Sequence, residues 1–191
     1  MKKQHFIVFA SVLIVLFTVT LLAQNKPKDP YGKADKAEVI VRQVKPNHFV
    51  FELGWDNDEK LAALTFPLIV KGKNFKMHYD SVSWKGRAEG FAVKSVLPID
   101  SLQQVLVGLL ADITGSTPPL GEGKGALAKL YFTVDSGTKR AIDVCEIMVD
   151  TTTIGASNNT LYGVIPDGTG GIHPAYSVVR MSAAGQPILC K

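Results

Sequence analysis

The sequence predicts an all-β fold in which two antiparallel sheets pack as a sandwich or jelly roll. Two observations lead to this fold class. Short apolar runs recur along the chain, and residues that favour turns separate each run from the next. Within the clearest runs every second residue is apolar, which is the pattern of a strand with one buried face.

Nine apolar runs are candidate strands, and their alternation is clearest in Val39–Gln43 and Phe49–Trp55. The nine runs are Ala37–Val44, Phe49–Trp55, Leu61–Val70, Phe75–Val82, Phe91–Leu97, Val105–Ala111, Ala126–Val134, Ala141–Val149 and Tyr176–Met181. The turn signals between them are Lys45-Pro46-Asn47, Asp56-Asn57-Asp58, Lys71-Gly72-Lys73-Asn74, Lys85-Gly86-Arg87 and Ser136-Gly137.

One run is compatible with two structures. Its apolar residues between Leu102 and Ile113 also fall at helical spacing, and Asp100 or Ser101 is available as a cap. A strand is favoured for Gln104–Ala111, because alternate residues are apolar and Gly108 would weaken a helix by roughly 1 kcal/mol relative to alanine.

The N-terminal segment has the order of regions found in secretory signal peptides. Lys2 and Lys3 precede the apolar run Phe6–Leu22, and the small residue Ala23 comes just before a polar stretch. Residues 1–23 are therefore interpreted as a signal peptide, and residues 24–36, rich in Lys, Pro, Asp and Gly, as a linker. The alternative is an uncleaved segment that anchors the chain in a membrane. The expected location is secreted, periplasmic or on the cell surface.

The chain length indicates the number of domains, and the charge distribution excludes one class of partner. Removing 23 of the 191 residues leaves 168, which is enough for one domain, assigned to residues 37–191. Without Lys2 and Lys3, 19 of the 21 basic residues face 17 acidic ones, a net charge of about +2. The basic residues are scattered and not interleaved with stacking aromatics, so no nucleic-acid partner is expected.

Two cysteines, Cys145 and Cys190, remain in the predicted mature chain. An oxidising compartment would allow them to pair, and closing that loop would stabilise the domain by roughly 4 kcal/mol in the chain-entropy model. The alternative is a buried free Cys145 with a frayed C-terminal tail.

No catalytic or cofactor-binding pattern is recognisable. The histidines His48, His78 and His173 are too widely separated for a compact metal motif. The carboxylates Asp56, Asp58 and Glu59 are close together and could hold Ca²⁺, but a solvated loop is favoured because no EF-hand spacing follows. Hydrolytic and phosphate-loop motifs are absent from the sequence. The sequence therefore predicts a non-enzyme without cofactor or metal.

The order of three segments resembles bacterial cohesin domains. The run Leu61–Asp80 is followed by Val105–Thr114 and then by Gly121–Val134, a strand that starts after glycines and carries Leu127, Leu130 and Phe132. The resemblance covers roughly Ala37–Met181 and implies a nine-stranded jelly-roll sandwich. The stretch His78–Trp84 replaces the family's usual tyrosine-aspartate-proline turn, so no binding residues are carried over.

The resemblance implies a non-catalytic module that docks a dockerin-bearing secreted protein through an exposed sheet face. The alternative is a carbohydrate-binding sandwich at the cell surface, in which Trp55, Trp84 and Tyr79, with Tyr162 and Tyr176, stack on a polysaccharide. The two hypotheses differ in a testable way, because stacking requires these rings to be exposed.

Overall fold

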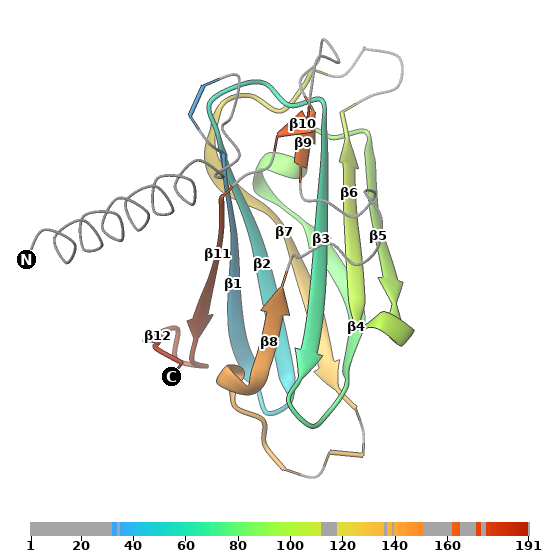
Figure 1. Ribbon diagram of the computed structural model, residues 1–191, viewed down its shortest axis with the longest axis vertical. Coiled ribbons are helices and arrows are strands. Elements are labelled where there is room, and N and C mark those ends of the chain that lie inside the picture. Colours follow the sequence, from blue (N-terminus) through green and yellow to red (C-terminus); the bar gives the residue numbers. More distant parts are fainter. Residues whose placement is uncertain are drawn as a thin grey trace, which may run out of the picture.

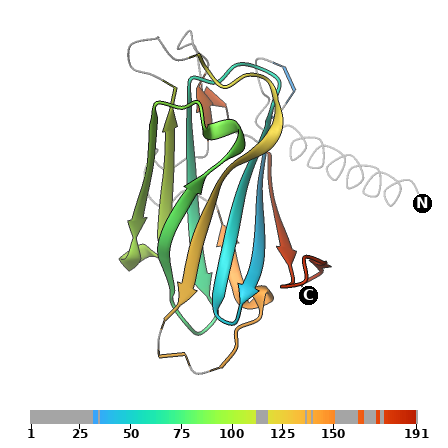
Figure 2. The same ribbon diagram turned by 180° about the vertical axis from the view of Figure 1, so that it is seen from behind.

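The computed structural model describes residues 32–33, 35–111, 118–135, 137–138, 140–150, 162–164, 171–172 and 175–190. These residues form twelve β-strands and three short 3-10 helices. The strands make two sheets, and Figures 1 and 2 show the same sandwich from its two sides. The predicted all-β, two-sheet architecture is confirmed.

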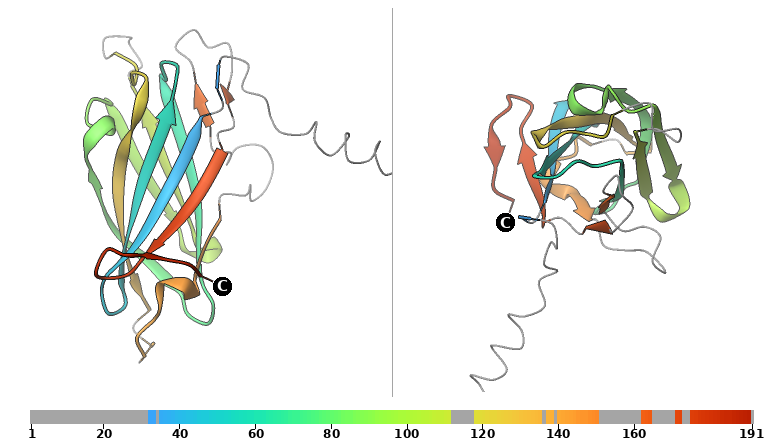
Figure 3. Two further views of the ribbon diagram at one scale, coloured as in Figure 1. Left: turned by 90° about the vertical axis from the view of Figure 1, so that its left-hand side faces the viewer. Right: turned by 90° about the horizontal axis from the view of Figure 1, so that it is seen from above.

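The first sheet has the strand order β12-β11-β1-β2-β7-β4. Its strands are β1 (Lys36–Lys45), β2 (His48–Asn57), β4 (Met77–Trp84), β7 (Gly123–Val134), β11 (Ala175–Met181) and β12 (Pro187–Ile188). Figure 3 shows β11, β1, β2 and β7 side by side. Among the described pairings, that of β1 with β11 is parallel, whereas the sequence predicts antiparallel sheets throughout. The two strands come from opposite ends of the domain, so a long connection is available to bring them side by side in parallel.

The second sheet has the order β10-β9-β3-β6-β5, and β8 also pairs with β3. Its strands are β3 (Ala63–Gly72), β5 (Val93–Ile99), β6 (Gln104–Leu110), β8 (Ile147–Asp150), β9 (Tyr162–Val164) and β10 (Gly171–Ile172). The 3-10 helices are η1 (Gly86–Ala88), η2 (Asp100–Leu102) and η3 (Val144–Glu146). In Figure 1 the strands β8, β3, β6 and β5 face the viewer.

The core lies between the two sheets and follows from the alternation in the sequence. In β2 the buried side chains include Phe51, Leu53 and Trp55, because every second residue of a strand points to the same face. The ring of Phe51 lies 4.6 Å from that of Phe132 on β7. The ring of Trp55 lies 6.1 Å from that of Phe66 on β3, which joins one sheet to the other.

The segment with two possible structures is the strand β6. It pairs with β3 on one side and with β5 on the other, so its backbone hydrogen bonds are satisfied within the sheet. Gly108 has a packing role here, since a Cβ atom at this position would lie 3.0 Å from the Ser95 Oγ. Strand rather than helix is therefore confirmed, with its end at Leu110.

Three local expectations were wrong. The predicted strand Ala141–Val149 contains η3, and only its last part belongs to β8. The reason is a capping box: the Asp143 side chain accepts a hydrogen bond from the Cys145 N–H, and Glu146 accepts one from the Asp143 N–H. The predicted turn Asp56-Asn57-Asp58 starts later, because β2 extends through Asn57. The strand count exceeds nine, since the short strands β9, β10 and β12 carry no long apolar run.

The N-terminal predictions fall largely outside the described residues. The predicted signal peptide 1–23 lies outside them entirely, as does most of the linker 24–36, and β1 begins at Lys36. Within the described part of the chain, no helix is both long and apolar enough to cross a membrane.

Candidate functional site

The outer face of the second sheet carries many apolar residues among those that the structure describes. On β3 and β6 the core takes Leu64, Phe66, Leu68 and Val70, and Val105, Val107 and Leu109. The residues between them therefore point away from the core, and of these Pro67 and Ile69 are themselves buried. Together with their partners on β5 and β8 they form what we call the apolar face: Ala63, Thr65, Pro67, Ile69, Val93, Ser95, Leu97, Leu106, Gly108, Leu110 and Met148.

The register aligns the members of the apolar face in rows across the strands. Leu97 on β5 lies opposite Leu106 on β6, which in turn lies opposite Pro67 on β3. In the next row Ser95 lies opposite Gly108. Because directly opposed side chains of antiparallel strands lie next to one another, each row forms a continuous surface. The row formed by Thr65, Gly108 and Ser95 has small side chains, and apolar rows lie on both sides of it.

Exposure distinguishes this face from the rest of the described surface. Six large hydrophobic residues among the described ones are exposed, and three of them are on this face: Val93 at 42% and Leu97 at 56% on β5, and Met148 at 56% on β8, where it lies opposite Lys71. Single exposed apolar residues are ordinary, whereas several on one continuous surface are typical of an interaction site.

Polar residues lie at the margins of the apolar face. Lys71 and Asp150 are exposed where β3 pairs with β8. At the opposite margin, the edge strand β5 contains Pro98, which has no N–H to donate to an additional strand. An apolar centre with a polar rim is the usual anatomy of a protein–protein interface. The geometry favours contact across the face over addition of a strand at its edge.

The first predicted stacking ring, Trp55, is buried. Only 1% of it is exposed, and its Nε1–H donates a hydrogen bond to Asp35 Oδ2 at 3.0 Å. The prediction that Trp55 stacks on a sugar is therefore wrong. Its position in the alternation of β2 places the ring between the two sheets, where it packs against Phe66.

The other two predicted rings also face inward. Tyr79 and Trp84 on β4 are half-buried and pack against the core. The Tyr79 ring lies 5.9 Å from that of Phe132, and burial raises the pKa of its hydroxyl. Trp55, Trp84 and Tyr79 thus form no exposed platform. The side chains of the other two candidates, Tyr162 and Tyr176, lie outside the described part of the chain.

The structure joins Cys145 and Cys190 by a disulfide bond, one of the two alternatives that the sequence left open. Cys145 lies in η3 rather than in the strand predicted for it. The bond ties the C-terminal segment after β12 to the start of β8. Arg180 on β11 reinforces this connection by donating a hydrogen bond to the Ile147 carbonyl at 2.7 Å.

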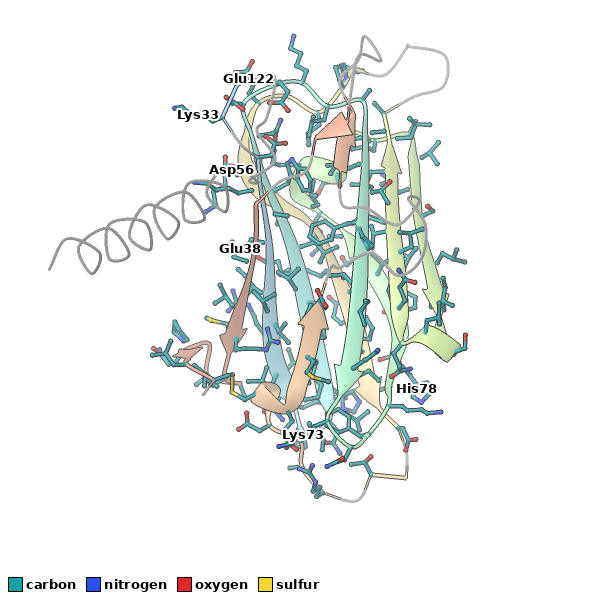
Figure 4. All side chains as sticks on the ribbon, in the orientation of Figure 1. Lys33, Glu38, Asp56, Lys73, His78 and Glu122 are labelled. Carbon is teal, nitrogen blue, oxygen red and sulfur yellow. A yellow bond between two sulfur atoms is a disulfide. The ribbon has the colours of Figure 1, made fainter. Side chains whose placement is uncertain are left out.

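The described histidines do not assemble with one another. His48 Nδ1 lies 2.9 Å from the Pro46 carbonyl, and His78 is exposed on β4. Figure 4 shows His78 near one end of the sandwich, with Lys33, Asp56 and Glu122 near the other. His173 lies outside the described residues.

The predicted carboxylate cluster has a different membership in the structure. Asp58 and Glu59 come together with Asp35, and one ligand atom of each lies within 4.8 Å of the others. Asp56 is not part of this group. Sequence reasoning missed Asp35 because it lies 23 positions before Asp58, and only the pairing of Lys36 with Asp56 brings the two segments together.

Comparisons with known proteins identify the fold. No protein-family model matches the sequence, and no curated protein matches it. Among solved structures, the cohesin of OlpA from Clostridium thermocellum, in a complex with the dockerin Doc918, has a TM-score of 0.58 and 11% identity, covering 78% of this chain and 100% of that one. The third cohesin of ScaC from Acetivibrio cellulolyticus, in complex with the ScaB dockerin, has a TM-score of 0.56 and 14% identity, covering 75% and 94%.

A third neighbour is the seventh ScaB type I cohesin from Pseudobacteroides cellulosolvens. It has a TM-score of 0.53 and 16% identity, covering 80% of this chain and 96% of that one. The similarity extends over nearly the whole length of these neighbours. The domain therefore has a cohesin-like fold, as the order of its sequence segments predicted.

Proposed function

We propose that this cohesin-like domain is a non-catalytic binding module that docks a partner protein through the apolar face. The observation that carries the proposal is the exposure of Val93 and Leu97 on β5, each opposite a half-buried leucine of β6, Leu110 and Leu106. Water contact with such side chains is unfavourable, and a partner that covers them would gain the free energy of their burial.

The partner that we propose is a dockerin-bearing secreted protein. Support comes from the solved neighbours, since the OlpA and ScaC cohesins were both determined in complexes with dockerins. At 11–14% identity, the similarity to these structures is evidence for the fold alone. The choice of partner rests on the combination of that fold with an apolar outer sheet face.

We further propose that the domain works outside the cytoplasm, as a secreted, periplasmic or cell-surface module. In this proposal residues 1–23 direct export and residues 24–36 link the export segment to the domain. The disulfide between Cys145 and Cys190 supports this, because such bonds persist in oxidising compartments and are rare in the cytosol.

A matched pair of variants tests the docking face. Leu97 on the apolar face is 56% exposed, and Val44 on β1 of the other sheet is 53% exposed. Leu97→Asp introduces a charge that a docked partner would have to desolvate, whereas Val44→Asp makes a similar change away from the face. Calorimetric titration with a dockerin domain should show an affinity at least about 30-fold lower for Leu97→Asp.

The control variant and the unchanged protein define which results would contradict the proposal. Val44→Asp should bind with the affinity of the unchanged protein, and both variants should retain its melting temperature, since both side chains are exposed. Equal affinities of the two variants would exclude the apolar face as the docking surface. An absence of dockerin binding by the unchanged protein would exclude the proposed partner.

A further inference from the structure

The carboxylates of Asp35, Asp58 and Glu59 come together at the end of the sandwich where Figure 4 labels Lys33 and Asp56, and Asp35 and Asp58 line a depression there. They come from two segments: Asp35 immediately precedes β1, and Asp58 and Glu59 immediately follow β2. The antiparallel pairing of Lys36 with Asp56 aligns these segments. We call the group formed by Asp35, Asn57, Asp58 and Glu59 the acidic cluster.

The carboxylates of the acidic cluster differ in their exposure and in their hydrogen bonds. Asp35 is 2% exposed, and one of its oxygens accepts the Trp55 Nε1–H bond at 3.0 Å. Asp58 is exposed, and its Oδ2 accepts a hydrogen bond from the Lys33 backbone N–H at 2.9 Å. Glu59 is half-buried. One ligand oxygen from each of these three residues lies within 4.8 Å of the others.

Asn57 provides an independent observation that points to a ligand. It is 4% exposed, and its Nδ2 donates hydrogen bonds to the carbonyls of Glu59 and Gly121. Two acceptors beside Nδ2 fix the orientation of the amide. Its Oδ1 is buried and has no hydrogen-bond partner, although Asn57 lines the same depression as Asp35 and Asp58. A buried acceptor without a donor is costly, and a cation would satisfy it.

We propose that the acidic cluster is a Ca²⁺ site, with carboxylate oxygens from Asp35, Asp58 and Glu59 and the amide oxygen of Asn57 as ligands. Calcium takes six to eight oxygens at about 2.3–2.6 Å, so opposite ligands lie about 5 Å apart across the ion. The observed limit of 4.8 Å fits within that span. Magnesium needs near-ideal octahedral geometry at about 2.0–2.1 Å, so we expect it to bind these oxygens more weakly than calcium does.

The site would fasten three separate parts of the chain to one another. Asp35 belongs to the approach to β1, Asp58 and Glu59 to the connection after β2, and Asn57 contacts Gly121 just before β7. A cation bound only by the folded arrangement stabilises it by mass action. The alternative neutralising charges are Lys33 and Lys36, which line the same depression.

The test compares calcium binding by the purified protein with that of two variants. Asp58→Asn removes one exposed ligand, and Glu122→Gln makes the same change of charge at an exposed residue near the same end of the molecule. We expect one saturable calcium site by calorimetry, an affinity at least about tenfold lower for Asp58→Asn, and an unchanged affinity for Glu122→Gln. Glu59→Gln serves as a second variant should Asp58→Asn fold poorly.

Two further readouts accompany the titration. At a calcium concentration about one hundred times the dissociation constant, the melting temperature should rise by about 5–10 °C. Terbium should replace calcium and show luminescence excited through Trp55, because the Trp55 ring contacts Asp35. The proposal is overturned if the unchanged protein binds no calcium, or if Asp58→Asn and Glu122→Gln respond to calcium equally.

Discussion

Individual residues reveal both what the alternation in the sequence predicts and what it misses. The alternation from Phe49 to Trp55 correctly predicts which side chains of β2 share a face. It leaves open whether that face is buried, since an apolar ring suits a core as well as a glycan surface. The burial of Trp55 follows from the packing of β2 over β3, where Phe66 meets its ring, and such long-range packing cannot be read from local spacing.

The hydrogen bond between Trp55 and Asp35 should contribute measurably to stability. Trp55→Phe keeps an aromatic ring but removes the N–H that Asp35 accepts, so we expect a loss of about 3 kcal/mol in the free energy of unfolding. Trp84→Phe is the control, since Trp84 is only half-buried, and should cost less than about 1 kcal/mol. Chemical denaturation measures both values, and equal losses would contradict the role assigned to this bond.

The ion pair between Arg140 and Glu146 predicts a dependence of stability on pH. Arg140 holds the pKa of Glu146 at about 2, below the ordinary value of 4.5, through two hydrogen bonds at 2.7 and 2.5 Å. A lowered pKa means that this contribution is present above about pH 4.5 and is lost as the pH falls toward 2. Glu146→Gln should therefore be less stable than the unchanged protein at neutral pH, and the difference should shrink over that interval. A constant difference from pH 7 to pH 2 would contradict it.

At the scale of elements, most strands could be predicted but their neighbours could not. Apolar runs marked β1 to β7 and β11 because each carries enough alternating residues to bury one face. The prediction was wrong for the run before β8. Val144 and Ile147 have the apolar character of strand residues, but Asp143 and Glu146 cap a 3-10 helix that contains Cys145. The parallel pairing of β1 with β11 and the two-residue strand β12 depend on tertiary contacts that leave no local pattern.

The disulfide fastens η3 to the segment after β12, and its removal should destabilise the domain. Closing a loop over a sequence separation of 45 residues predicts a loss of roughly 4 kcal/mol on reduction. Chemical denaturation with and without a reductant measures this loss. The double variant Cys145→Ala with Cys190→Ala should be as unstable as the reduced protein and should not respond to reductant. An equal stability of the oxidised and reduced proteins would contradict the predicted contribution.

At the scale of the whole molecule, the cohesin-like fold could be predicted from the order of a few segments, whereas the docking face could not. Val93 and Leu97 lie on β5 and Met148 lies on β8, and each run read as a possible core strand. Their common outward direction depends on the registers of β5 with β6, of β6 with β3, and of β3 with β8. An interaction surface built from several strands becomes visible only after the sheet is assembled.

The measurement that tests partner docking most directly is a pull-down from the secreted fraction of the source organism. The unchanged protein, Leu97→Asp and Val44→Asp are immobilised in parallel, and mass spectrometry identifies and quantifies the retained proteins. We predict a dockerin-bearing protein in stoichiometric amounts on the unchanged protein and on Val44→Asp, and its loss from Leu97→Asp. Retention of no dockerin-bearing protein, or equal retention by all three, would contradict docking through the apolar face.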